Sequence, residues 1–351
     1  MTGKKTKKIM AGAVPIGGGS RISVQSMCNT RTWDVEATVT QILSLEVAGC
    51  EIVRLAIPDM RAAEAVSAIR ERVHIPLVAD IHFDYRLALA AAERGIDKIR
   101  INPGNIGAEE NVRAVADACR RRGIPIRIGV NAGSLEKRLL EKYGHPCPEA
   151  LVESARGHIA LLNRYDFDDI CLSVKSSSVP LTIASYRAAA EAFDYPLHLG
   201  VTETGTLYNG TISSAVGIGT LLSEGIGDTV RVSLTADPVE EVRAAIAILK
   251  AAGVRSGGIR FISCPTCGRT EIDLISLAQD VENALKDIDR DITVAVMGCV
   301  VNGPGEAREA DYGIAGGRDK GLIFRKGTVV GTYPYDRLLD ALMDMIREED
   351  A

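Results

Sequence analysis

The sequence alternates short apolar runs with longer Ala-rich segments of helical periodicity, and this alternation most constrains its fold. Runs rich in Val, Ile and Leu are typical of strands buried in a parallel sheet, and longer amphipathic segments are typical of helices. The predicted strands are 22–27, 52–57, 76–81, 98–102, 126–131, 170–175, 197–202 and 229–234. Each is followed by a predicted helix, which favours a closed (β/α)8 TIM barrel of about 250 residues. A doubly wound open sheet is the alternative, but it usually has fewer parallel strands.

A glycine-rich linker at Gly257 and Gly258 separates these units from a smaller region. That region predicts the strands 259–263, 292–296, 311–315, 321–325 and 328–333 and the helices 272–286 and 335–348. Such a mixture is typical of a compact α+β domain. We therefore expect two domains, a barrel over residues 1–255 and an α+β domain over residues 256–351.

The composition excludes several classes of protein. The formal net charge is −5, which gives no general affinity for nucleic acids. No apolar run is long enough for a membrane-spanning helix, and the eight cysteines are too dispersed for a secreted disulfide scaffold. We expect a cytoplasmic protein with no membrane association, in which the lysine run at 4–8 forms a solvated tail.

Three cysteines of the second region form the clearest chemical motif. Cys264 and Cys267 frame a Pro-Thr pair, and Cys299 lies in a Gly/Pro-rich turn further on. Three thiolates favour a soft metal centre such as an iron–sulfur cluster, whereas a structural zinc site wants a fourth Cys or His. No Cys follows Cys299 and no His follows His198, so a nearby fourth ligand must be oxygen, and Glu306 is the nearest downstream carboxylate. Zinc, a redox pair and merely buried thiols remain alternatives.

Basic residues occur in five of the predicted barrel strands, namely Arg54, Arg100, Arg127, Lys175 and Arg231. One charged strand residue is explained by a core salt bridge, but five converging on a barrel interior predict a cationic pocket. Asp80 and Glu203 offset only part of this charge. Arginine makes forked contacts with phosphate oxygens, so we expect a small phosphate or diphosphate substrate. The chain has no GxxxxGK[ST] stretch, which excludes P-loop chemistry.

Ten short motifs are distributed along the chain. They are SVQSM (23–27), RLAIPD (54–59), VADIHF (78–83), KIRINPGN (98–105), GVNAGSLE (129–136), SVKSS (173–177), VTETG (201–205), VRVSL (230–234), SCPTCGRT (263–270) and MGCVVNGPGE (297–306). Together they resemble the bacterial 4-hydroxy-3-methylbut-2-enyl diphosphate synthase family of the non-mevalonate isoprenoid pathway. The resemblance extends in order from Arg21 to Tyr333, and Thr204 stands where related sequences often have Ala.

The resemblance implies a [4Fe-4S] cluster held by Cys264, Cys267, Cys299 and Glu306. It implies that the substrate is 2-C-methyl-D-erythritol 2,4-cyclodiphosphate. Members of the family open this ring and remove a hydroxyl with two electrons from reduced flavodoxin or ferredoxin.

Roles for individual residues follow from this reading. Glu306 would be a weak cluster ligand that yields its place to substrate, and Glu203 would deliver a proton or orient a substrate hydroxyl. Pairing of Glu203 with Arg231 or Lys175 is the alternative. The remaining predicted substrate contacts, beyond the five basic residues, are Asn102, Asn131, Ser233, Ser26 and His82. A buried core histidine is the alternative for His82, and Asp80 is expected to orient its neighbours.

The linker creates a geometric problem, because the last barrel helix runs back toward the end of the barrel opposite the pocket. A head-to-tail homodimer, in which the cluster domain of one chain caps the barrel of the other, solves it, and the family resemblance implies the same arrangement. Two further functions compete with this reading. One is a zinc-stabilised barrel enzyme acting on a phosphate, and the other is an electron carrier without catalysis, which would not need a cationic pocket.

Overall fold

The computed structural model describes residues 5–286, 288, 290–299 and 307–348, and these divide into two compact units, Met1–Arg255 and Ser256–Ala351. Each unit is described by itself. Unit 1 is a parallel barrel whose strands follow the order β8-β7-β6-β5-β4-β3-β10-β9. The strands are β3 (Ser23–Met27), β4 (Ile52–Ala56), β5 (Leu77–Asp80), β6 (Lys98–Ile101), β7 (Ile126–Asn131), β8 (Ile170–Lys175), β9 (His198–Leu199) and β10 (Thr229–Val230). A parallel bridge between Leu172 and Leu197 joins β8 to β9 and closes the ring.

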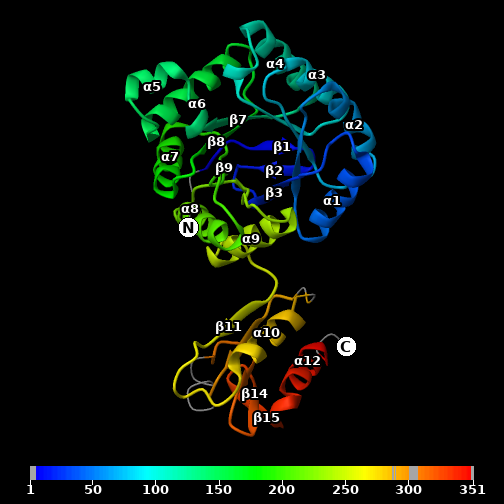
Figure 1. Cartoon of the computed structure of the whole chain (residues 1–351), viewed down its shortest axis with the longest axis vertical. Coiled ribbons are helices and arrows are strands. Elements are labelled where there is room, and N and C mark those ends of the chain that lie inside the picture. Colours follow the sequence, from blue (N-terminus) through cyan, green and yellow to red (C-terminus); the bar gives the residue numbers. More distant parts are fainter. Residues whose placement is uncertain (1–4, 287, 289, 300–306, 349–351) are drawn as a thin grey trace. The chain divides into compact units, whose positions relative to one another are not determined.

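Helices surround the strands on the outside of the barrel (Figure 1). They are α1 (Val35–Val47), α2 (Met60–Arg70), α3 (Tyr85–Glu93), α4 (Glu109–Arg122), α6 (Pro148–Asn163), α7 (Val179–Ala192), α8 (Leu207–Ser223) and α9 (Pro238–Ala251). Aspartates cap several of them, as where the side chain of Asp59 accepts a hydrogen bond from the Ala62 amide. The predicted (β/α)8 class is therefore confirmed.

Two local predictions need correction. The seventh and eighth strands have only two residues each, because the chain beyond His198–Leu199 and Thr229–Val230 turns into the loops of the barrel mouth. The short helix α5 (Lys137–Tyr143), between β7 and α6, was not predicted.

A hairpin before the first barrel strand seals the N-terminal end of the barrel. Its strands are β1 (Ile9–Ala11) and β2 (Val14–Ile16), paired antiparallel. Ile9, Ala11 and Ile16 pack against Ile52, Val78 and Cys171 inside the barrel. The alternating apolar pattern on each side of Gly12 is the sequence signal for this hairpin.

The lysines at 5, 7 and 8 are exposed to solvent as predicted, but part of this segment is attached to the barrel. Lys7 forms an ion pair with Asp168, and its ammonium lies 4.5 Å from the centre of the Tyr195 ring. The Thr6 hydroxyl donates to Asp228, with 2.8 Å between the oxygens. These contacts attach residues 6 and 7 to the N-terminal end of the barrel.

The lower interior of the barrel is polar. Lys98 is fully buried, and its ammonium has no hydrogen-bond partner among the described residues. Polar side-chain atoms of Gln25, His198 and Thr229 are also buried, and they have no hydrogen-bond partner among the described residues. Burial lowers the pKa of Lys98 to about 8, with Cys171 opposing and Arg127 and Arg54 reinforcing the shift. The barrel therefore carries a desolvated cation beneath its pocket.

Unit 2 is a sheet of order β11-β12-β13-β14-β15, with β11 (Arg260–Ser263), β12 (Thr293–Met297), β13 (Tyr312–Ala315), β14 (Lys320–Arg325) and β15 (Thr328–Pro334). The first three strands are parallel and the last two extend the sheet antiparallel. Helices α10 (Leu274–Ala284) and α12 (Leu338–Glu348) contribute to one apolar core with the sheet. Among the described residues of the whole chain, no helix is long and apolar enough to cross a membrane.

We expect Lys98→Met to stabilise the protein at neutral pH. The amine has a pKa of about 8 when folded and an ordinary value of 10.5 when unfolded, so its burial destabilises the fold fully below pH 8. That drop corresponds to about 3 kcal/mol, which disappears as the pH rises through 10.5. Urea unfolding of variant and parent at pH 7 and at high pH measures the difference.

The exposed Lys250→Met variant is the matched control for Lys98→Met, and its effect should stay within about 0.5 kcal/mol at both pH values. A gain in Lys98→Met that does not change with pH would show that buried charge is not its cause.

Candidate active site

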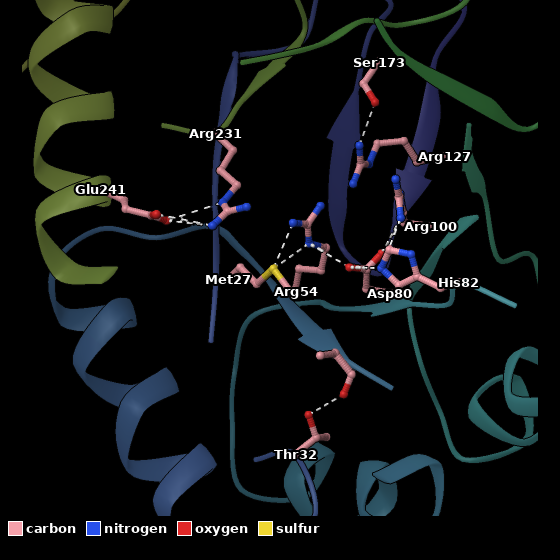
Figure 2. Close-up of polar contacts among 11 residues, drawn as sticks. Met27, Thr32, Arg54, Asp80, His82, Arg100, Arg127, Ser173, Arg231 and Glu241 are labelled. Carbon is pink, nitrogen blue, oxygen red and sulfur yellow. Dashed lines mark hydrogen bonds and ion pairs between the residues drawn. The ribbon is translucent and has the colours of Figure 1, made fainter. Parts of the chain in front are cut away.

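A cavity of about 240 Å³ opens inside the barrel at the C-terminal ends of the strands, where (β/α)8 enzymes carry their active sites. Its lining is almost entirely polar. The residues are Arg54, Asp80, His82, Arg100, Arg127, Asn131, Lys175, Thr202, Arg231 and Ser233. All five of the predicted basic residues are present, and Figure 2 shows Arg54, Arg100, Arg127 and Arg231 gathered in one region.

Strand register brings the basic residues together. Arg100 on β6 pairs in register with Asp80 on β5 and with Arg127 on β7, and alternate positions of each strand face the barrel interior. Two glycines leave room for these long side chains. A Cβ added at Gly129 would lie 2.7 Å from Arg100 Nε, and one at Gly200 would lie 2.5 Å from Lys175 Nζ.

Asp80 is the acidic centre of the pocket. Its carboxylate lies 3.1 Å from Arg100 Nη1, 3.8 Å from Arg54 Nε and 3.4 Å from His82 Nε2. Burial by itself would raise the pKa of Asp80, but Arg54, His82 and Arg100 together hold it well below its usual range. Asp80 is therefore a carboxylate that orients three neighbours, as the sequence predicted.

Arg54 and Arg127 have spare hydrogen-bonding capacity. The Arg54 guanidinium donates to the Met27 thioether over 3.0 and 2.8 Å, and a thioether is a weak acceptor. Arg127 donates one bond to Ser173, at 2.8 Å, while Nε and Nη2 have no partner among the described residues. Burial lowers the pKa of Arg127 to about 10, and it also lowers that of Arg54. An anion placed here would offset this cost of burying charge.

Lys175 faces the same cavity from β8. Burial, followed by the charges of Arg127 and Arg231, holds the pKa of its amine well below its usual range. A bound anion would favour the protonated amine, so the pocket gains attraction for an anion as the anion enters.

Arg231 has a partner that sequence reasoning missed. Glu241 on α9 is buried and accepts hydrogen bonds from the Arg231 guanidinium at 3.3 to 3.4 Å, as Figure 2 shows. The same carboxylate accepts from Ser26 Oγ and from the Leu234 amide. An acidic residue in the first turn of a helix is ordinary, so the sequence contains no signal for this role.

Three of the site residues predicted in the barrel do not line the cavity. Ser26 is fully buried and its hydroxyl donates to Glu241 at 3.2 Å, which does not support a substrate contact. Asn102 is buried, and its side chain accepts a bond from the Gly104 amide. Glu203 is exposed on the loop after β9, and no ion pair between it and Arg231 or Lys175 is found among the described residues.

His82 and Thr202 complete the rim. The His82 side chain is 57% exposed and lies against Asp80, so the alternative of a buried core histidine is wrong. Thr202 was not predicted as a site residue, although it stands one residue before Glu203 on the loop after β9. Its position in the predicted strand 197–202 was the available signal.

The three motif cysteines lie in unit 2, and all are free thiols. Cys264 follows β11 and Cys299 follows β12, so both stand at the same ends of neighbouring parallel strands. Cys264 Sγ accepts a bond from the Gly298 amide at 3.2 Å. Bonds from the backbone and side chain of Arg269, and from Thr270, hold the pKa of the Cys267 thiol below its usual value. These features suit thiolates that bind a soft metal.

The metal shell itself is not complete in the described residues, where no three metal-ligating side chains are gathered around one point. Glu306, the predicted fourth ligand, lies outside the described residues. The three free thiols, two of them just after the C-terminal ends of the neighbouring strands β11 and β12, fit a soft metal centre by their chemistry.

The fold and cavity define a (β/α)8-barrel protein with a cationic pocket, joined to an α+β domain with a cysteine motif. The chain belongs to the GcpE family. It matches the GcpE TIM-barrel domain over residues 6–246 and the GcpE protein C-terminal domain over residues 260–348.

Curated relatives carry one name, 4-hydroxy-3-methylbut-2-en-1-yl diphosphate synthase (flavodoxin). That of Geobacter sulfurreducens is 60% identical over 339 residues, covering 97% of this chain and 96% of the relative. That of Clostridium perfringens is 60% identical over 346 residues and covers 99% of both chains. The resemblance inferred from motifs is thereby confirmed.

Solved structures of dihydropteroate synthases resemble the fold. The Yersinia pestis structure has a TM-score of 0.51 and 16% identity, covering 71% of this chain and 99% of that chain. The Stenotrophomonas maltophilia structure has a TM-score of 0.52 and 14% identity, covering 70% and 97% respectively. These identities support a shared fold alone.

We expect Glu241→Gln to lower the free energy of unfolding by about 3 kcal/mol, because removing one partner of a buried ion pair leaves the other charge uncompensated. Glu240→Gln is the matched control on the same helix, since Glu240 pairs with the exposed Arg243. That control should change stability by less than about 1 kcal/mol. Equal effects of the two variants in urea unfolding would contradict the assigned role of Glu241.

Proposed function

We propose that this chain converts 2-C-methyl-D-erythritol 2,4-cyclodiphosphate into 4-hydroxy-3-methylbut-2-enyl diphosphate. It is an oxidoreductase of isoprenoid biosynthesis, as its curated relatives' names imply. The reaction takes up two electrons and two protons. The cyclic diphosphate opens at a carbon–oxygen bond, and one hydroxyl oxygen leaves as water. We also propose that the enzyme acts in the cytoplasm.

The observation that carries this proposal is the charge of the cavity. Five basic side chains line it against one acidic side chain, Asp80. Such an excess is costly in a buried site unless a polyanion occupies it. The diphosphate of the substrate supplies that charge, and guanidinium groups suit its oxygens. Asn131, Thr202 and Ser233 add hydrogen-bonding groups at the same cavity.

Electrons require a second component, for which we propose a [4Fe-4S] cluster held by Cys264, Cys267, Cys299 and Glu306. When bound, it supplies single electrons and Lewis-acid chemistry for loss of the hydroxyl. The free thiols and the lowered pKa of Cys267 support the cysteines as ligands. The role of Glu306 as the fourth ligand stays a prediction, because this residue lies outside the described residues.

Glu203 is our candidate for moving a proton to or from a substrate hydroxyl. Its backbone has φ 55°, a left-handed conformation that is uncommon for a residue other than glycine. Strained backbone of this kind clusters at active sites. The exposed carboxylate stands on the loop after β9, close in sequence to the cavity residue Thr202.

The partners also belong to the proposal. The names of the relatives favour flavodoxin as the electron donor, with ferredoxin as the alternative. Arg255, the last residue of unit 1, binds Glu51 at 2.6 Å just before β4, so the chain leaves the barrel at the end opposite the cavity. This exit supports a homodimer in which the cluster domain of one chain closes the barrel of the other. Gly257 and Gly258 are the candidate hinge.

The proposal is tested with protein purified without oxygen. We expect iron and sulfide in cluster stoichiometry and conversion of the cyclodiphosphate when reduced flavodoxin or a chemical reductant is added. A colourless protein with stoichiometric zinc would favour the zinc-barrel alternative. A protein with iron and sulfide but without turnover would favour an electron carrier.

The pocket is tested by Arg54→Gln. We expect a loss of at least about tenfold in kcat/KM, because one charge-assisted contact to the diphosphate disappears. Arg72→Gln is the control, since Arg72 is an exposed residue that pairs with Glu36 outside the cavity. Iron content should stay unchanged in both variants. Equal kinetics of the two variants would show that Arg54 does not bind substrate.

A further inference from the structure

A buried histidine on α6 reaches the loops at the barrel mouth. His158 is 6% exposed, and its Nε2 lies 3.1 Å from Glu136 Oε1. Ser154, one turn earlier on the same helix, donates to the same oxygen at 3.0 Å. Glu136 stands directly before α5, five positions after the cavity residue Asn131. Helix α6 thus holds the loop that follows β7.

The same imidazole touches the loop that follows β6. A Cβ added at Gly104 would lie 3.0 Å from His158 Cε1, so the ring packs against the backbone there. The Gly104 amide donates to the Asn102 side chain at 3.1 Å. Asn102 comes two residues after Arg100, which lines the cavity. The His158 side chain therefore contacts both the loop after β6 and the loop after β7, which follow the cavity residues Arg100 and Asn131.

Glu136 is held as an anion. Burial opposes ionisation, but His158, the backbone amide of Glu136 and Ser154 lower the pKa of the carboxyl to about 2. The side chains of Glu136 and His158 are 26% and 7% exposed, so solvent screens the pair only in part. Among the described residues, no strand pairing connects the two loops beyond the ends of β6 and β7, whereas His158 contacts both.

We propose that Glu136 and His158 are positioning residues that clamp the loops after β6 and β7 and thereby set the spacing of Arg100 and Asn131 for the diphosphate. This inference rests on the proposed function of the cavity. Neither residue lines the cavity. Their effect is on geometry, because a forked phosphate contact is lost when its donors shift by about an ångström.

A second Glu–His pair in the same barrel is a matched control. His74 Nδ1 lies 2.8 Å from Glu46 Oε2. His74 precedes β5, so this pair lies at the N-terminal end of the barrel, away from the cavity. Disrupting it should affect stability alone.

The experiment uses the full chain and inorganic pyrophosphate as the probe, measured by calorimetry, together with steady-state kinetics on the cyclodiphosphate. We expect His158→Leu and Glu136→Leu each to weaken pyrophosphate binding and raise KM by about tenfold, with a smaller change in kcat. The double variant should be no worse than either single variant, because both remove one interaction. His158→Gln, which keeps a polar group facing Glu136, should recover much of the affinity. His74→Leu should bind pyrophosphate like the parent.

Two outcomes overturn the inference in distinguishable ways. If the parent chain binds pyrophosphate and His158→Leu binds it equally well while melting at a lower temperature, the pair is structural only. If the parent chain does not bind pyrophosphate, the proposed anion pocket is wrong and the clamp falls with it. Strictly additive losses in the double variant would show that the two residues act separately.

Discussion

An excess of positive charge inside the barrel is the constraint that the rest of the structure must accommodate. Arg100, Arg127 and Lys175 are buried beside the partly buried Arg54, and Asp80 is the one acidic residue among the described residues that line their cavity. Their mutual repulsion and desolvation lower the pKa of Arg54, Arg127 and Lys175. Stability is thereby given up at this point, and a polyanion is the ligand that would recover it. The same buried positive charge therefore both lowers stability and attracts an anion.

The rest of the barrel compensates for that charge. The hairpin β1–β2 closes the lower end with apolar side chains, which keeps water away from the buried Lys98. Glu241 holds Arg231 from outside the strands, and glycines at 129 and 200 leave space for long side chains. At the mouth, the contacts of His158 join two loops. Each of these features affects either the position or the solvation of a basic side chain in the barrel.

Sequence patterns predicted the barrel because its strands are apolar runs and its helices are amphipathic, and both periodicities are local. They also predicted most of the pocket, since residues at strand ends of one barrel must meet. Ser26 was predicted as a substrate contact, but its hydroxyl donates to Glu241, because strand boundaries leave the facing of a single side chain undecided. Glu241, Thr6 and Lys7 were missed in their roles because their partners are far away in the chain.

The family, the barrel, the basic strand ends and the three cysteines could all be identified from residue type and spacing, which are local properties of the chain. Only the tertiary structure decided which groups lack partners. It showed that Arg127 and Lys98 are desolvated, that Met27 is the weak acceptor for Arg54, and that His158 bridges two loops. Burial and pairing depend on residues distant in sequence, so no local pattern contains them.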